Sequence, residues 1–130
     1  MKTGYFYHLK EYESAGYVPV SIARYSPPFY HGLEYKTLAP PHDLLNDYKY
    51  GPHKGDVNHF QIEYLGILAG FDAKQIIKDL EELTGVKEDK IILLCFEKPS
   101  DFCHRKLVAA MLKVYGGIEC EELEACVKKK

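Results

Sequence analysis

The sequence of 130 residues has no tryptophan, no large excess of charge of either sign and no long apolar run. A net charge of −2 provides no broad positive field for nucleic acid or for an anionic membrane surface. No stretch approaches the ~20 apolar residues of a membrane span, and the first residues lack a signal-peptide pattern. We therefore expect a cytoplasmic protein with neither a nucleic-acid partner nor a membrane partner.

Cysteine is confined to the last third of the chain, at Cys95, Cys103, Cys120 and Cys126. Neither a C-x-x-C pair nor an H-x-x-x-H pair occurs, so the common spacings of a zinc site are missing. In a reducing compartment we expect these cysteines to be thiols. A disulfide framework is also not required, because a chain of this length can bury a sufficient core as one domain.

The order of the expected elements favours a small three-layer α/β domain over residues 1–130. Strands are expected at about 3–7, 17–24, 91–95 and 118–120, and helices at about 41–50, 58–70, 72–85 and 101–115. The strand at 91–95 is apolar throughout, which indicates a central position covered on both faces. We therefore expect a mostly parallel sheet of about four strands flanked by helices.

Residues 26–41 contain prolines, a glycine and aromatic side chains without the period of a strand or a helix. We expect a long loop that is ordered by the packing of its rings. These rings and the adjacent Tyr25 could stack on a ligand or serve only as the loop's own hydrophobic packing. Four histidines scattered in polar segments are assigned no site: His31, His42, His53 and His59.

The most informative stretch is an apolar strand, a short polar loop and a helix whose first turn carries Cys103, His104 and Arg105. In parallel sheets, ligands collect beyond the carboxyl ends of the strands. The backbone N–H groups of a helix's first turn suit a phosphate, sulfate or carboxylate there. Arg105, and Arg24 at the end of the second strand, would add planar guanidinium donors. The pattern predicts an anion site.

His104 falls on the helical stripe that includes Val108 and Tyr115, given ~3.6 residues per turn. That stripe is expected to face the sheet, so His104 should point toward Glu97, whose carboxylate would orient the ring and raise its pKa. Two roles stay open for this histidine. It is either a catalytic group or a buried residue that holds the strand, loop and helix together.

Cys103 lies at a helix N-terminus beside a histidine and an arginine, surroundings that lower a thiol pKa and favour a nucleophile or a redox-sensitive thiol. The alternative is a small buried residue. A zinc site of Cys95, Glu97, Cys103 and His104 is disfavoured, because the adjacent Cys103 and His104 would diverge around the helix. The loop also has no glycine for the phosphate cradle of a phosphatase or sulfurtransferase. We expect no metal and no cofactor.

Residues 95–109 resemble the family of domain of unknown function 488, whose signature is a strand ending in Cys-x-Glu, five residues, and Cys-His-Arg. The resemblance extends through residues 19–24, the Leu-Ala-Pro at 38–40 and the helix around Tyr64. Many members have an aspartate two residues before the arginine of the second strand, where this chain has Ile22. The resemblance implies a compact α/β domain and nominates the motif residues as the site.

The sequence predicts that an anionic small molecule, phosphorylated or nucleotide-like, binds at the carboxyl end of the sheet. Hydrolase or transferase activity is expected if the protein is an enzyme. The candidate residues are Glu97, Cys103 and His104 for catalysis, Arg105 and Arg24 for the anion, and Tyr25 and Tyr64 for packing against the ligand. Two alternatives stay open: a ligand-binding module without catalysis, and a motif that only joins strand to helix.

Overall fold

The computed structural model describes residues 1–96 and 104–123. Its sheet is parallel and five-stranded, with the strand order β3-β2-β4-β1-β5. The strands are β1 (Lys2–Tyr5), β2 (Val18–Ser21), β3 (Leu33–Glu34), β4 (Ile91–Cys95) and β5 (Glu121–Glu122). The predicted α/β class with a flanked parallel sheet is confirmed. Strand β3 lies in the segment predicted as a loop, and β5 begins just after the predicted last strand.

Five helices connect these strands in the described part of the chain: α1 (Leu9–Ser14), α2 (His42–Tyr50), α3 (Val57–Leu68), α4 (Ala73–Thr84) and α5 (His104–Gly116). Short 3-10 turns lie at Phe6–His8, Lys36–Leu38 and Glu88–Lys90. Helix α4 has the predicted boundaries, because the Asp72 side chain caps its first turn and Gly85, at a φ of 76°, ends it in the left-handed region. None of the described helices combines the length and apolar character needed to cross a membrane.

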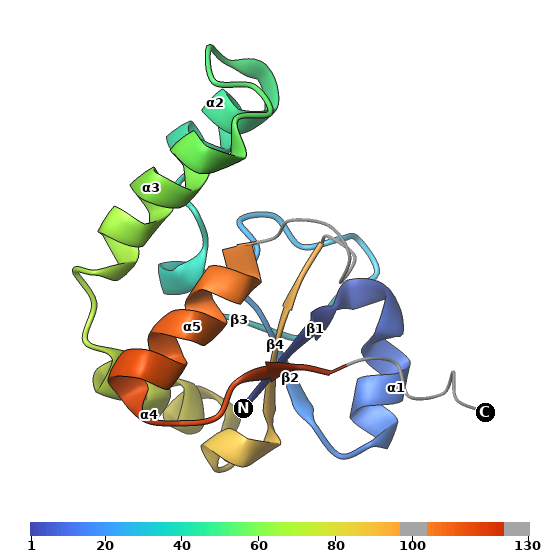
Figure 1. The fold of residues 1–130 in the computed structure, drawn as a ribbon. Coiled ribbons are helices and arrows are strands. Elements are labelled where there is room, and N and C mark those ends of the chain that lie inside the picture. Colours follow the sequence, from blue (N-terminus) through green and yellow to red (C-terminus); the bar gives the residue numbers. More distant parts are fainter. Residues whose placement is uncertain (97–103, 124–130) are drawn as a thin grey trace.

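The neighbouring strands β1 and β4 send the chain in opposite directions across the sheet. From β1 the chain passes through α1 to β2, whereas from β4 it passes through α5 to β5 on the far side of β1. Because crossovers between parallel strands are right-handed, opposite directions place the helices on opposite faces. Accordingly, α1 lies on one side of the sheet and α4 and α5 lie on the other (Figure 1). Ligand sites in such sheets lie at the carboxyl ends near this reversal.

The core is centred on β4, all of whose residues are buried, as the continuous apolar run predicted. Helix α5 covers this strand with His104, Val108 and Leu112, in agreement with the predicted stripe. Tyr115 departs from the stripe and is 71% exposed. The last turn of α5 instead packs on α4 through Gly116, where an added Cβ would lie 2.7 Å from Cδ1 of Ile77.

Helices α2 and α3 form an antiparallel arm that extends away from the carboxyl end of the sheet (Figure 1). Helix α3 packs against α5, and its Tyr64 ring meets the ring of His104 in the first turn of α5. The buried Tyr64 of α3 donates its hydroxyl to the backbone carbonyl of Leu38. This contact joins the arm to the segment that follows β3. The arm therefore places α2 over the end of the sheet.

Leu93 lies in the middle of β4 and is fully buried, so Leu93→Ala should lower the free energy of unfolding by about 2–5 kcal/mol. Leu65 of α3 is 46% exposed and offers a matched control. Urea denaturation should show a change of about 1 kcal/mol or less for Leu65→Ala. Equal losses in the two variants would contradict the central position of β4.

Candidate functional site

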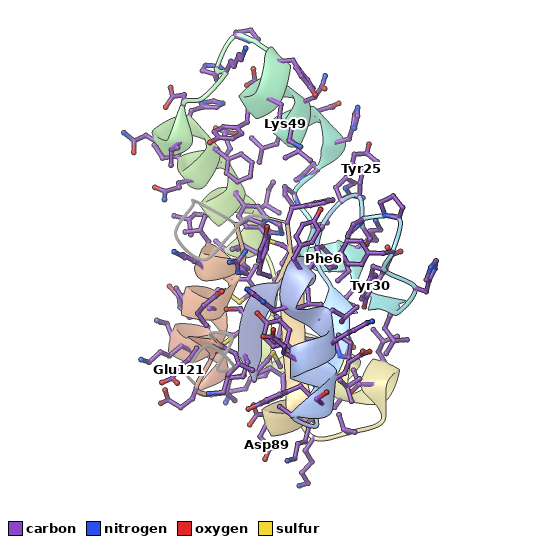
Figure 2. All side chains as sticks on the ribbon, turned by 90° about the vertical axis from the view of Figure 1, so that its right-hand side faces the viewer. Phe6, Tyr25, Tyr30, Lys49, Asp89 and Glu121 are labelled. Atoms are coloured by element: carbon purple, nitrogen blue, oxygen red, sulfur yellow. The ribbon has the colours of Figure 1, made fainter. Side chains whose placement is uncertain are left out.

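A cavity of about 60 Å³ lies at the carboxyl ends of β2 and β4. Its walls come from residues 23–25 after β2, from Phe96 after β4 and from His104 at the start of α5. Helix α2 closes it through Leu45 and Lys49. Figure 2 shows Tyr25 between Lys49 above it and Phe6 below it. The cavity therefore lies where the parallel sheet and the helix order predict a ligand site.

His104 is fixed by a hydrogen bond to the segment that follows β2. Its Nε2 lies 2.8 Å from the backbone oxygen of Ile22. Because a carbonyl oxygen can only accept, Nε2 carries the proton and Nδ1 carries the lone pair. Burial lowers the pKa of His104 to about 4, and the nearby Arg105 guanidinium acts in the same direction. His104 is therefore a neutral imidazole at physiological pH.

The pKa of His104 thus shifts in the opposite direction to the one predicted from the sequence, because desolvation of the ring outweighs the hydrogen bond to Ile22. Glu97, the expected partner of this ring, lies outside the described residues, as does Cys103. The ring edge instead meets Tyr64, with the two ring centroids 5.5 Å apart and the planes at 87°. Tyr64 is fully buried behind the histidine and does not line the cavity.

Arg24 lines the cavity and is anchored by backbone carbonyls. Its Nε donates to the oxygen of Pro40 at 3.0 Å, and its Nη2 donates to that of Ala39 at 3.4 Å. Among the described residues, nothing accepts a hydrogen bond from Nη1, and no carboxylate pairs with Lys49. The described walls also contain no acidic side chain. The cavity therefore combines two cationic groups with a neutral histidine.

Arg105 points away from this cavity, although the sequence nominates it for anion binding. The side chain is fully buried, and its Nε and Nη2 donate to the two carboxylate oxygens of Glu122 at 2.9 and 3.0 Å. Its Nη1 lies 3.2 Å from Sγ of Cys95. One helical step of about 100° separates Arg105 from His104, so the two side chains face different parts of the fold. Arg105 binds a carboxylate of its own chain and joins α5 to β5.

The expectation of thiols is wrong for Cys95, which is disulfide-bonded. Cys120 is a free and buried thiol, as expected for a small core residue. Burial is the main cause that raises the pKa of the Cys120 thiol to about 11. This cysteine is therefore protonated at physiological pH and takes no part in the site.

Sequence reasoning missed five residues of the cavity: Ala23, Pro40, Leu45, Lys49 and Phe96. Leu45 and Lys49 are four residues apart on α2, so they lie on the same side of that helix. The apolar stripe of α2 was visible in the sequence, but the direction of the arm was not. Phe96 directly follows β4, and its ring packs edge-on against Phe6 with the centroids 5.5 Å apart. That contact fills the space between β1 and β4, so the cavity lies toward β2.

A second cavity of about 260 Å³ adjoins the first and shares Tyr25, Leu45 and Lys49 with it. The Tyr25 hydroxyl lies 2.6 Å from Nδ1 of His42, which holds this exposed ring in place. The remaining walls include Tyr50. The smaller cavity can accept a compact anionic group, and the larger one offers aromatic walls for the rest of a ligand.

Comparison with protein families gives a match over most of this chain. A family model for the active DUF488-N3 subclade (DUF488-N3a) matches residues 16–116. The matched range contains all described residues of the smaller cavity and excludes β1 and β5. No curated protein and no solved structure matches the chain.

The ion pair between Arg105 and Glu122 should be essential for stability. Glu122→Gln removes a carboxylate that pairs with the buried guanidinium of Arg105, and because Glu122 is partly exposed we expect a loss of about 3 kcal/mol in the free energy of unfolding. Glu121→Gln is the matched control, since its pair with Lys2 is exposed and should contribute about 1 kcal/mol or less. Urea denaturation measures both values, and similar losses would argue against the structural role of Arg105.

The low pKa of His104 predicts a loss of stability on acidification. The folded pKa of about 4 lies below the ordinary histidine pKa of 6.5, so the unfolded chain binds more protons between these two values. The free energy of unfolding should therefore fall as the pH drops from 6.5 to 4, with a contribution on the order of 3 kcal/mol from His104. His104→Gln should remove this contribution. An NMR titration that gives His104 an ordinary pKa would contradict the buried neutral ring.

Proposed function

The chain belongs to the DUF488 family, and from this premise we propose that it binds an anionic small molecule, phosphorylated or nucleotide-like, at the carboxyl end of its sheet. The observation that carries the proposal is the charge of the smaller cavity. Arg24 and Lys49 line it, and its described walls contain no carboxylate. The neutral His104 adds no charge there. An anion would therefore be attracted by both cationic side chains, with no acidic group in the described walls to oppose it.

Arg24 is suited to anion binding because its side chain is already held in place. Two backbone carbonyls fix its guanidinium group, so little side-chain entropy would be lost when a ligand binds. Lys49 is exposed and supplies a mobile point charge at the entrance. The smaller cavity of about 60 Å³ accommodates the anionic group, and the adjoining cavity of about 260 Å³ accommodates an organic portion against Tyr25. Arg105 supports the site from behind by holding α5.

We propose hydrolysis or group transfer as the activity to test at this site. Glu97 and Cys103 remain the catalytic candidates from the sequence, and both lie outside the described residues. His104 would orient the bound group as a neutral imidazole. The alternative is a module that binds or sequesters the ligand without catalysis, with the same cationic residues serving affinity. A cytoplasmic location, expected from the sequence, is part of the proposal.

Lys49→Ala should weaken the binding of phosphorylated ligands without loss of stability, because Lys49 is exposed. Loss of one charge-assisted contact corresponds to a decrease of about tenfold in affinity. Isothermal titration with pyrophosphate and with adenosine monophosphate at low salt measures the effect. Lys78→Ala, an exposed lysine on α4 outside both cavities, is the matched control and should bind like the wild type. Failure of the wild type to bind either probe, or equal weakening in both variants, would reject the anion site.

Two further variants separate an enzyme from a binding module. If hydrolysis or transfer occurs, Cys103→Ser or Glu97→Gln should abolish turnover of the bound ligand and leave its affinity within about threefold, since neither change removes a cationic group. Mass spectrometry of the ligand after incubation reports turnover. Binding by the wild type with no product formed would favour the noncatalytic module.

A further inference from the structure

Three potential metal ligands meet at the tip of the α2 and α3 arm. They are Asp47 on α2, His53 in the turn between the helices and His59 on α3. Nδ1 of His53 lies 2.7 Å and Nε2 of His59 lies 3.5 Å from the same oxygen, Oδ2 of Asp47. All three ligand atoms fall within 4.8 Å of one another. The residues are spaced six apart in the sequence, and only the reversal of the chain brings them together.

The backbone of the turn between α2 and α3 holds these side chains in place. Gly55, at a φ of 74°, takes the left-handed conformation that closes the turn, and its N–H donates to the carbonyl of Tyr48 at 2.9 Å. Oδ1 of Asp47 accepts the backbone N–H of His53 at 3.1 Å. The carboxylate is thereby oriented so that its second oxygen, Oδ2, faces the two rings.

The first turn of α3 orients the third side chain of the cluster. The carboxylate of Asp56 caps this helix and accepts the backbone N–H of His59 at 3.0 Å. The rings of His53 and His59 stack with their centroids 3.6 Å apart and their planes at 8°. Each ring thereby brings one nitrogen atom within 4.8 Å of the Asp47 carboxylate.

Charge also favours a cation at this point. The backbone N–H of His53 is the first cause that lowers the pKa of Asp47, and hydrogen bonding and charge from the two histidines lower it further. Asp47 is therefore ionised at neutral pH. A carboxylate and two imidazoles form a ligand set suited to first-row divalent metals. No other group of this kind occurs in residues 1–96 and 104–123.

We propose that Asp47, His53 and His59 bind a divalent transition metal, with Zn²⁺ as the ion to test first and water completing its coordination. Zn²⁺ lies about 2.0–2.2 Å from nitrogen and oxygen ligands, which requires ligand atoms about 3–3.5 Å apart. The oxygen and Nδ1 now 2.7 Å apart must separate slightly, and the stacked rings must rotate so that both lone pairs point at the ion. All three side chains are partly exposed, so both movements and access of water are possible.

This metal site is separate from the proposed anion site. None of the three ligands lines either cavity described above. Asp47 and Lys49 are both on α2, but two residues correspond to about 200° around a helix, so their side chains leave opposite sides. Loss of zinc binding should therefore leave anion binding intact. Conversely, Lys49→Ala should bind zinc like the wild type.

Zinc titration of the purified, chelator-treated chain tests the proposal, with calorimetry and native mass spectrometry as readouts. The wild type should bind a single Zn²⁺ at this site, and the double variant His53→Gln with His59→Gln should bind it at least about tenfold more weakly. His31→Gln, which removes an exposed histidine outside the cluster, should bind like the wild type. In NMR spectra, the ring signals of His53 and His59 should shift on zinc addition while that of His31 stays unchanged.

A second variant covers the case in which the double variant fails to fold. Asp47→Asn keeps an oxygen that can accept the N–H of His53 but removes the charge, and it should weaken zinc binding by about tenfold. Affinity in the wild type should also fall on acidification, because protons compete with the metal for the imidazole nitrogens. Absence of saturable zinc binding, or equal binding by wild type, Asp47→Asn and any folded double variant, would overturn the proposal and leave the cluster as an ion pair only.

Discussion

The hydrogen bond from His104 to the carbonyl of Ile22 is the contact on which the end of the sheet depends. It joins the first residue of α5 to the segment after β2, across the end of β4. A buried carbonyl without a hydrogen-bond partner would destabilise the fold. This bond gives the Ile22 carbonyl its partner, and it also fixes the tautomer of the His104 ring. It also sets the distance between the two segments that form the cavity. Tyr64 behind the ring then connects this bond to the arm.

His104 and Arg105 are adjacent but have separate tasks, because a helix turns by about 100° per residue. His104 faces the cavity, whereas Arg105 reaches in another direction to Glu122 and the terminal strand β5. The guanidinium group of Arg105 therefore stabilises the architecture here, and the cationic character of the cavity comes from Arg24 and Lys49. The side chain of Ile22 is buried and apolar, while its backbone oxygen anchors the histidine.

The arm gives this small domain two regions of different chemistry. Its inner side brings Lys49 over the cavity, and its tip gathers Asp47 with two histidines. Both depend on the turn that reverses the chain between α2 and α3, where Gly55 adopts its left-handed conformation. The arm is therefore more than a connection between strands, because it carries Lys49 and the Asp47 cluster, which lie outside the motif.

The sequence by itself determined several of the elements, because each of these has a local cause. The apolar run Ile91–Cys95 gave the central strand, Asp72 and Gly85 bounded α4, and the stripe of α5 placed His104 inward. Local patterns contain no information on partners that are distant in the chain. The burial that keeps His104 neutral, the pairing of Arg105 with Glu122 and the convergence of Asp47, His53 and His59 all arise from contacts between separate elements. Only the tertiary structure decided them, because desolvation and ion pairing depend on which groups the fold brings within a few ångströms of each other.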